Sequence, residues 1–370
     1  MKDPNLNIVQ VIYSLIQGGA ERFVVDLSNE LSKSNKVTIV TIRDDKNKEN
    51  TFFRNEINQK VTYINFPIKE GFRISDIFKL NKLINSIKPD VIHAHLDTIY
   101  YLLFRSIYDN NIKIFHTIHN DARFDGRKKL ASSIRKLFYK HNIIKPITIS
   151  IESDLSYRSF YKTGNPILIN NGRKKPTKSA NYELVKKEIS DLKKNKNDLV
   201  FIHISRFNEK QKNHSMLVKV FNTLLYLKYN LILLIIGRDF DSEEAKQIQK
   251  LATKGIYFLG DKENIGDYLF LSNAFCLTSN YEGLPISLLE SLACGVIPIC
   301  TPVGGIKNII EHGITGYLSN SISNQEYLKV VIEFINNPHK ISKSKLVDHF
   351  NSNFSIKICA SEHEKAYSKA

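Results

Sequence analysis

Residues 279–305 read SNYEGLPISLLESLACGVIPICTPVGG, and this stretch decides how the second half of the chain folds. Pro285 suits the first position of a helix, and the apolar side chains of residues 286–293 recur at helical spacing. Gly295 suits the C-terminal cap of that helix, and residues 296–299 form the apolar run of a buried strand. The segment therefore predicts a turn, a helix and a strand in immediate succession.

The same segment carries two carboxylates around the predicted helix. Glu282 lies just before the helix N-terminus, where free N–H groups attract anions such as phosphates. Glu290 lies two turns further along, roughly 12 Å away at 1.5 Å per residue. A ligand with a sugar at one end and a nucleoside at the other could span that distance. The alternative is an ordinary helix with one acidic cap and one solvated glutamate.

This pattern resembles the signature of retaining glycosyltransferases of family 4, in which seven residues separate two glutamates, as they separate Glu282 from Glu290 here. The resemblance implies that Glu282 contacts the donor sugar and that Glu290 binds the ribose hydroxyls of the nucleotide. It places Gly283, Leu284 and Pro285 at the donor. It also implies an α/β chain of GT-B fold, with two doubly wound Rossmann-like domains facing each other across a cleft.

A basic loop follows the apolar run 199–204 and is placed to hold a diphosphate. On its own it could equally be a solvated loop. It resembles the Gly-Arg…Lys element of the family, in which the two cations neutralise the leaving diphosphate, and this implies catalytic roles for Arg206 and Lys212. Ser205 stands where glycine is usual, and Lys210 is an alternative to Lys212. Gly237 follows the next strand and is expected at the donor.

The first half of the chain offers further candidates after its strands. Gly18 and Gly19 open a helix directly after the first strand, and glycines there let a backbone approach a ligand closely. They resemble the family's Gly-Gly-Ala-Glu-Arg loop near the diphosphate. His119 resembles the histidine that faces the reacting sugar. His95 and His116 are weaker candidates.

Some of the histidines and acidic residues are expected to have a structural role and no part in a binding site. His93 is expected to be buried on its strand. No Cys or carboxylate completes a metal site with the histidines, and the Asp239-x-Asp241 pair is expected to be solvated. We therefore expect a metal-independent protein without a cofactor.

Strand-like apolar runs alternate with helical patterns throughout, which predicts parallel sheets covered by helices. The predicted helices of the first half are 19–33, 75–86 and 97–108. The predicted strands are 8–13, 37–41, 61–64, 91–94, 113–117, 146–149 and 166–169, then 199–204, 231–236, 256–259, 274–277 and 296–299.

A polar, turn-forming linker at residues 170–176 divides the two series. We predict an N-terminal acceptor-binding domain at 1–172 and a C-terminal nucleotide-sugar domain at 173–355. Residues 356–370 are predicted to form a helix that crosses back to the first domain.

Composition narrows the class further. The chain has 370 residues, 42% of them hydrophobic, which suits two globular domains. The longest apolar runs are far shorter than a membrane span, and no signal peptide is recognisable. The four cysteines lack metal-ligand spacing and suit a cytoplasmic protein with free thiols.

The net charge of +16 is concentrated in the first half, most densely between Arg123 and Lys145. Apolar residues recur there at helical spacing between the basic ones. Such a stretch can bind an anionic membrane surface or nucleic acid, or it can pack on its own domain and solvate its charges. No nucleic-acid motif occurs elsewhere, so we expect no nucleic-acid partner, and we expect a protein that is cytoplasmic and peripheral to the membrane if the stretch docks.

Together these features predict a retaining glycosyltransferase that moves a sugar from a nucleotide-sugar, most commonly a UDP-sugar in this family, to an acceptor hydroxyl. The expected acceptor is a glycan or lipid-linked glycan in bacterial surface polysaccharide or glycolipid biosynthesis. The alternatives are a nucleotide-sugar epimerase of the same fold and a non-catalytic nucleotide-binding relative.

Overall fold

The computed structural model describes residues 5–68, 73–102, 112–119, 122 and 129–369. The chain divides into two compact units. The first unit comprises Met1–Arg173 together with Phe354–Ala370, and the second comprises Lys174–Asn353. These boundaries lie within two residues of those predicted from the sequence, and the C-terminal segment belongs to the first unit.

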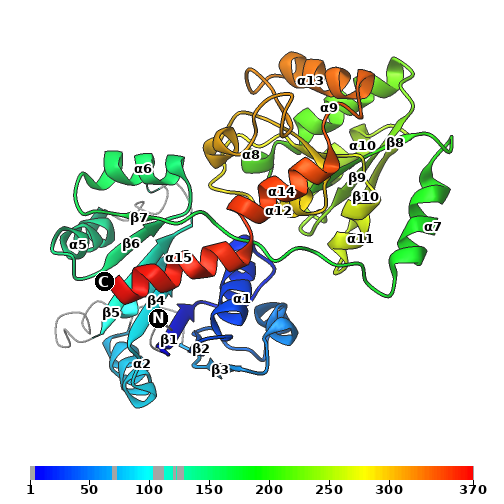
Figure 1. Ribbon diagram of the computed structural model, residues 1–370. Coiled ribbons are helices and arrows are strands. Elements are labelled where there is room, and N and C mark those ends of the chain that lie inside the picture. Colours follow the sequence, from blue (N-terminus) through cyan, green and yellow to red (C-terminus); the bar gives the residue numbers. More distant parts are fainter. Residues whose placement is uncertain (1–4, 69–72, 103–111, 120–121, 123–128, 370) are drawn as a thin grey trace. The chain divides into compact units, whose positions relative to one another are not determined.

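The first unit contains a sheet of seven strands within the described residues, all paired in parallel in the order β3-β2-β1-β4-β5-β6-β7 (Figure 1). The strands are β1 (Asn7–Ile12), β2 (Lys36–Thr41), β3 (Val61–Asn65), β4 (Val91–His95), β5 (Lys113–Ile118), β6 (Lys145–Thr148) and β7 (Ile167–Leu168). Each strand is a short run rich in β-branched residues, and parallel strands buried on both faces favour such runs.

Helices cover both faces of this sheet. The sheet has a hydrophobic core on each face, and alternate residues of β1 belong to different cores, because successive side chains of a strand point to opposite faces. Ile8 and Ile12 pack with α1 (Gly19–Leu31) and α15 (Ile356–Lys369). Val9 and Val11 pack in the opposite core. That core is completed by α2 (Ile74–Ile87), α5 (Lys129–Lys140), α6 (Ile151–Tyr161) and the short 3₁₀ helix η3 (Leu96–Tyr101).

The structure corrects the start of the helix predicted for residues 97–108. A 3₁₀ helix, η3, takes up residues 96–101 instead, and residues 103–111 lie outside the described part of the chain. Leu96 has a left-handed backbone (φ 56°), which turns the chain sharply at the end of β4. Leu96 precedes the predicted helix, and after this turn the chain continues in the tighter 3₁₀ conformation up to Tyr101.

The linker also differs from its prediction as a polar turn, because Asn171, Gly172 and Arg173 are buried. A Cβ added at Gly172 would lie 2.4 Å from Cβ of Cys359 in α15, so this glycine permits close packing. Arg173 forms a buried ion pair with Asp26 of α1. Its N–H donates to the carbonyl of Phe354 at 2.9 Å, and its own carbonyl accepts from the N–H of Ile356 at 3.0 Å.

The second unit contains a six-stranded parallel sheet within the described residues, in the order β10-β9-β8-β11-β12-β13. Its strands are β8 (Leu199–Ile204), β9 (Leu231–Ile236), β10 (Ile256–Gly260), β11 (Ala274–Leu277), β12 (Ile297–Cys300) and β13 (Tyr317–Leu318). Its helices include α7 (Tyr182–Leu192), α8 (Glu209–Lys212), α9 (His214–Tyr226), α10 (Glu243–Leu251), α11 (Ile265–Phe270), α12 (Ile286–Ala293), α13 (Asn324–Asn336) and α14 (Lys343–Asn353), with the 3₁₀ helix η4 (Gly304–Asn308) after β12.

The opening segment folds as predicted with one shift. Pro285 is the N-cap of α12, with an extended backbone, so that Ile286 rather than Pro285 is the first helical residue. Cys294 ends the helix, and Gly295 follows with a left-handed backbone (φ 69°). Strand β12 then begins at Ile297. A proline at the N-cap still suits the helix start, because the first helical N–H groups have no partner within the helix.

Candidate functional site

In the second unit, the predicted donor residues gather at one edge of the sheet. Strands β8, β11 and β12 are neighbours, and they are parallel. The loops that leave their carboxyl ends carry Arg206, Glu282 and Gly304, in that order. Loops at the carboxyl ends of parallel strands are where α/β folds bind their ligands. The topology therefore brings together residues that lie far apart in the sequence.

The central contact of this edge joins Lys212 to Glu282. The ammonium Nζ of Lys212 lies 2.5 Å from Oε1 of Glu282, and both side chains are largely buried, at 13% and 6% exposure. The hydroxyl of Ser279 donates to the same Oε1 at 2.6 Å. Lys210 is exposed on the same short helix. The structure thus places Lys212, and not Lys210, beside the first glutamate.

Hydrogen bonds fix the two loops against each other around this ion pair. The hydroxyl of Thr278 donates to the carbonyls of Lys212 (3.0 Å) and Asn213 (3.1 Å). The backbone N–H of Asn280 donates to the carbonyl of Gln211 at 2.8 Å. These contacts hold the main chain on both sides of the pair, so the ammonium and the carboxylate are pre-positioned by their backbones.

Ser205, which stands where the family has glycine, joins two buried histidines. Its hydroxyl lies 2.8 Å from Nε2 of His203 and 3.1 Å from Nε2 of His214, and Nδ1 of His203 donates to the carbonyl of Cys276 at 2.9 Å. Burial lowers the pKa of His203 to about 4 and that of His214 to about 2. Both imidazoles are therefore neutral, and the serine holds the start of the basic loop to α9.

Two glycines are required where neighbouring loops touch. Gly237 has φ 152°, and a Cβ there would lie 1.8 Å from the carbonyl oxygen of Ser205. Gly304 has φ 50°, and its Cβ would lie 1.9 Å from the carbonyl oxygen of Glu282. Gly305 donates its N–H to the carbonyl of Gly283 at 2.8 Å. Only glycine fits either position, since both need positive φ and direct backbone contact.

Arg206 and Glu290 occupy the outer parts of this site. Arg206 is exposed on the loop after β8, and Glu290 is half-buried in the second turn of α12. Gly283 is half-buried beside the helix start, whereas Leu284 and Pro285 are buried. Leu284 and Pro285 can therefore offer backbone groups rather than side chains to a ligand.

In the first unit, the candidate residues lie at the carboxyl ends of the neighbouring strands β1, β4 and β5. Gly18 caps α1 with an extended backbone, and Gly19 is its first residue. Nδ1 of His95 lies 3.0 Å from Nε2 of His119, and the edge of Phe23 of α1 packs on His119 at 5.7 Å between ring centroids. The glycine loop and His119 thus share one edge of the sheet.

The protonation of these histidines follows from their partners. Nε2 of His95 donates to the amide oxygen of Gln10 at 2.7 Å, which leaves Nδ1 of His95 to accept from Nε2 of His119. Burial, and then the charge of His363, lowers the pKa of His119 to about 3. His119 is therefore neutral, with its Nδ1 as an acceptor. The role of Gln10 was not predicted, because nothing in the sequence of its strand indicates that its amide contacts a histidine 85 residues away.

The other two histidines of β4 and β5 that the sequence analysis considered, His93 and His116, have structural roles. His93 is buried as predicted, and its ring nitrogens contact the hydroxyls of Tyr367 and Thr117, each at 2.6 Å. His116 points to the opposite face of the sheet from His95 and contacts the hydroxyl of Tyr139 at 2.6 Å. His116 is therefore not part of the candidate site, because alternate residues of a strand face opposite cores.

The described residues also include neither a cluster of candidate metal ligands nor a helix that could span a membrane. No group of three or more His, Cys, Asp or Glu side chains among them could hold a metal ion. None of the helices in the described segments is both long and apolar enough to cross a membrane. Of the basic stretch Arg123–Lys145, residues 123–128 lie outside the described part, and the rest forms α5, a turn at residues 141–144 and the start of β6.

Two α/β units, each built on a parallel sheet with its candidate residues at the carboxyl ends of the strands, are the architecture of the GT-B fold, and comparison with known proteins identifies a glycosyltransferase. The model for "Glycosyltransferase Family 4" matches residues 17–144, and that for "Glycosyl transferases group 1" matches residues 185–353. The chain belongs to the group 1, family 4 glycosyltransferases.

Relatives that match nearly the whole chain are also glycosyltransferases. An uncharacterized glycosyltransferase of Haemophilus influenzae is 26% identical over 87% of this chain and 88% of its own length. An alpha-1,4-N-acetyl-D-galactosaminyltransferase of Campylobacter jejuni, named for a PP-undecaprenol-linked acceptor, is 25% identical over 96% of this chain and 98% of its own.

Solved structures show the same fold. Anabaena HepE in complex with UDP and glucose superposes with a TM-score of 0.80 and 16% identity, over 99% of this chain and 100% of that chain. The sucrose-phosphate synthase of Thermosynechococcus elongatus gives a TM-score of 0.79 and 16% identity, over 98% of each chain.

Proposed function

We propose that this glycosyltransferase is retaining and transfers a sugar from a UDP-sugar to an acceptor hydroxyl in the synthesis of a bacterial surface polysaccharide or glycolipid. The observation that carries the proposal is the Lys212–Glu282 pair at the start of α12. It joins a cation suited to a diphosphate to a carboxylate suited to a sugar. UDP and glucose in Anabaena HepE and the PP-undecaprenol-linked acceptor of the Campylobacter enzyme support the donor and acceptor classes.

In this proposal, the donor occupies the carboxyl edge of the second sheet. Arg206 and Lys212 bind the diphosphate and stabilise the negative charge that grows as the sugar–phosphate bond breaks. The N–H groups at the start of α12, beside Gly283, add to this stabilisation. Glu282 holds the sugar, and Glu290 holds the ribose hydroxyls. The acceptor hydroxyl attacks from the face that the leaving diphosphate vacates, and the diphosphate takes its proton, so that the configuration is retained.

The ion pair implies an exchange of partners when the donor binds. In the free enzyme, Glu282 neutralises Lys212 at 2.5 Å. A diphosphate that recruits Lys212 frees the carboxylate to accept hydrogen bonds from sugar hydroxyls. The hydroxyl of Ser279, at 2.6 Å, then remains as a fixed donor that keeps the carboxylate in place.

We further propose that His119 faces the transferred sugar. Its neutral imidazole offers Nδ1 as an acceptor for a sugar hydroxyl, because Nε2 donates to His95. Replacing His119 by Gln keeps hydrogen-bonding capacity but changes its geometry, so we expect reduced turnover with the fold intact. The glycine loop at Gly18 and Gly19 would let the backbone approach the diphosphate.

The experiment that tests the function measures release of free nucleotide from UDP-sugars, with and without acceptor. A transferase releases nucleotide in proportion to acceptor, an epimerase converts the sugar without acceptor, and a non-catalytic relative does neither. Arg206→Ala and Glu290→Ala should each nearly abolish transfer, whereas Lys250→Ala, an exposed change on α10, should not. Near-normal transfer in either site variant would contradict the assigned site.

Metal independence and membrane docking are proposed with their own tests. Transfer should persist in excess EDTA, because the proposed cations are Arg206 and Lys212. Leu137 of α5 is 55% exposed beside Lys136 and Lys140, which suits an anionic membrane surface. Leu137→Gln should then weaken sedimentation with phosphatidylglycerol vesicles, and equal binding to neutral vesicles would contradict docking by charge.

A further inference from the structure

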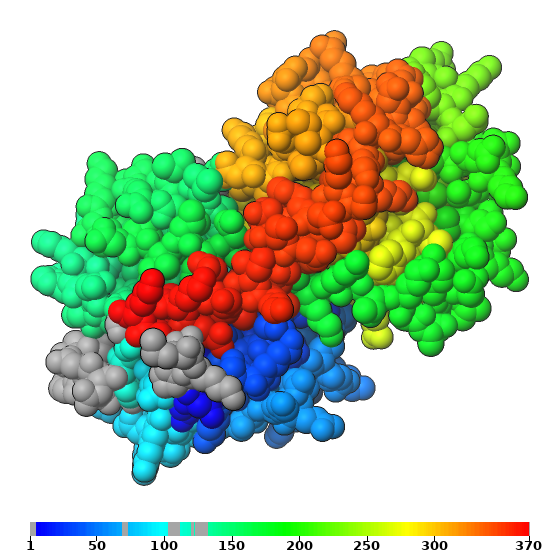
Figure 2. Space-filling view, in the orientation of Figure 1, coloured from blue at the N-terminus to red at the C-terminus, as the bar shows by residue number. Residues whose placement is uncertain are grey.

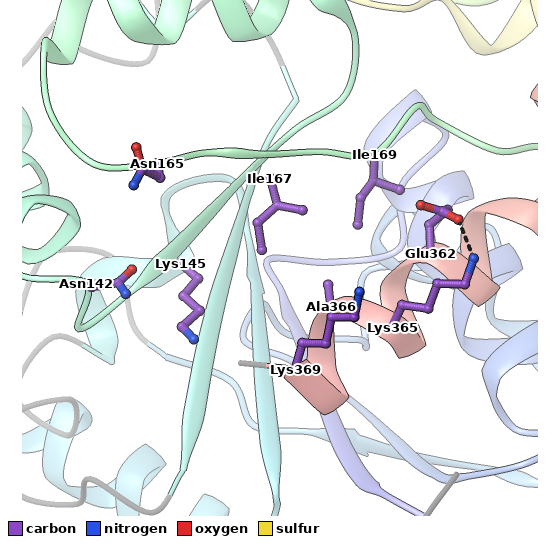
Figure 3. Close-up of a pocket in the computed structure, with 9 residues that line it drawn as sticks. All are labelled: Asn142, Lys145, Asn165, Ile167, Ile169, Glu362, Lys365, Ala366 and Lys369. Carbon is purple, nitrogen blue, oxygen red and sulfur yellow. Dashed lines mark hydrogen bonds and ion pairs between the residues drawn. The ribbon is translucent and has the colours of Figure 1, made fainter. Parts of the chain in front are cut away.

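A groove in the first unit lies at the edge of the sheet away from the candidate histidines. It has a volume of about 440 Å³ and is lined by residues of the loop before β6, of β6 itself, of the segment around β7, and of α15 (Figure 3). This volume is in the range of small-molecule sites. Lys145 is the first residue of β6, whereas His95 and His119 follow the other ends of their strands. The groove therefore begins at the amino edge and runs along β7 to Ile169, which follows that strand.

The wall formed by α15 follows from helical spacing. Glu362, Lys365, Ala366 and Lys369 are three or four residues apart, so they share one face of the helix. The face formed by residues 359, 360, 363 and 367 is buried in the core. In Figure 2, α15 lies at the surface of this unit, beside α1. One face of α15 therefore holds the fold while another lines the groove.

The floor of the groove is apolar and its rim is basic. Ile167, Ile169 and Ala366 form the floor. Lys145 and Lys369 lie on either side of Ile167 in the view of Figure 3. The amides of Asn142 and Asn165 complete the rim and can donate hydrogen bonds.

The charges of the rim do not cancel. Lys365 forms an ion pair with Glu362 at 2.9 Å, with both side chains about half exposed, and such a pair contributes little. Lys145 and Lys369 add two further ammonium groups, and Glu362 is the one carboxylate among the lining residues. An anion is the ligand that this excess of positive charge favours.

A further cation lies behind the rim. Lys113, the first residue of β5, donates to the carbonyls of Tyr367 at 2.9 Å and Ser368 at 3.3 Å at the end of α15. Burial, and then the positive charge of Lys113, lowers the pKa of Lys145. An anion bound between Lys145 and Lys369 would offset that repulsion, so the site gains from being occupied.

We propose that this groove binds a phosphate group, held by Lys145 and Lys369 with Asn142 and Asn165, with the apolar part of the ligand against Ile167 and Ile169. The phosphate belongs either to a lipid headgroup or to a soluble phosphate compound. This site is distinct from the proposed donor site, because all its lining residues belong to the first unit, whereas Arg206 and Lys212 belong to the second.

The test uses the full chain and two probes, inorganic pyrophosphate by titration calorimetry and phosphatidylcholine vesicles with or without phosphatidylglycerol by sedimentation. Lys145→Gln and Lys369→Gln should each weaken binding of the effective probe about tenfold, the loss expected for a hydrogen bond to a charged group. Glu362→Gln should strengthen it about threefold, because it removes the opposing carboxylate. Lys357→Gln, an exposed change on α15 outside the groove, should have no effect.

The pattern of probes identifies the source of the phosphate. Pyrophosphate binding alone indicates a soluble ligand, and charge-dependent vesicle binding alone indicates a lipid headgroup. Binding of neither probe overturns the proposal. So does binding that survives Lys145→Gln and Lys369→Gln but is lost in Arg206→Gln, since that result places the anion in the basic loop of the second unit.

Discussion

Replacing Lys212 by Met tests whether the ion pair with Glu282 is structural as well as functional. Methionine keeps an apolar side chain of similar length but removes the ammonium that lies 2.5 Å from Oε1. The carboxylate, 6% exposed, then keeps a short hydrogen bond from Ser279 and a long one, at 3.5 Å, from the side-chain amide of Gln211. Removing one partner of a buried pair costs about 3–5 kcal/mol. Because Lys212 retains 13% exposure, we expect the lower end, about 3 kcal/mol.

That loss should be visible in thermal unfolding followed by circular dichroism. For a unit of this size, about 3 kcal/mol corresponds to a decrease of roughly 6–12 °C in Tm. Lys210→Met is the matched control, because Lys210 is exposed on the same short helix and should change stability by less than about 0.5 kcal/mol. The double variant Lys212→Met/Glu282→Gln should regain part of the loss, since no buried carboxylate remains unpaired.

Two outcomes would refute this reasoning. One is a Lys212→Met protein with the same Tm as the wild type, which would mean that water or another group stabilises the carboxylate in place of the ammonium. The other is an equal loss in Lys210→Met, which would mean that the short helix and not the ion pair is responsible. Stabilisation of the wild type by UDP, and its loss in Lys212→Met, would separately report on the donor site.

Three further results are expected. Asp26→Asn should lower the free energy of unfolding by about 3 kcal/mol in urea titrations, because it removes the carboxylate that pairs with the buried guanidinium of Arg173. Gly237→Ala should abolish transfer and lower Tm, because a Cβ 1.8 Å from the carbonyl of Ser205 must displace the basic loop. Burial holds the pKa of His119 near 3, against an ordinary value near 6.5, so between these pH values the unfolded chain binds a proton that the folded chain does not. As the pH is lowered through this range, the free energy of unfolding in urea titrations should therefore decrease, by roughly 1.4 kcal/mol per pH unit for each such histidine.

One of these results has a matched control, and the other two have outcomes that would contradict them. Asp154→Asn, which breaks the pair of Asp154 with the half-exposed Arg158, should lower the free energy of unfolding far less than Asp26→Asn. Transfer that survives Gly237→Ala would show that the loop after β9 can move aside. Stability that stays constant from pH 6.5 to pH 4 would show that the buried histidines are protonated in the native state.

The sequence predicted most of the fold because its signals are local. Short β-branched runs between turn residues marked the strands, and the helix–strand order of residues 279–305 marked a parallel sheet. The same locality explains the shift at Pro285, which sits at the N-cap instead of the first helical position. Both positions suit proline, and sequence alone does not distinguish them.

The contacts that complete the site were not predictable because they join distant elements. The family resemblance favoured Lys212 over Lys210, but the contact that distinguishes the two lysines joins Lys212 to Glu282 in the loop after β11, 70 residues away. Ser205 acts through His203 of β8 and His214 of α9, and no spacing rule pairs those three residues. Gly172 looked like a turn glycine, but its reason is the close approach of Cys359 from the C-terminal helix.

In the first unit, two faces of the C-terminal helix α15 have different roles. Its buried face supplies Tyr367 to His93 and His363 to the core, beside the candidate histidines at the carboxyl edge. Its outer face supplies Lys365 and Lys369 to the groove at the amino edge. Since the two faces use different residues, the groove variants remove charge without touching the core. Loss of phosphate binding in those variants would therefore report on the groove itself, and not on a weakened fold.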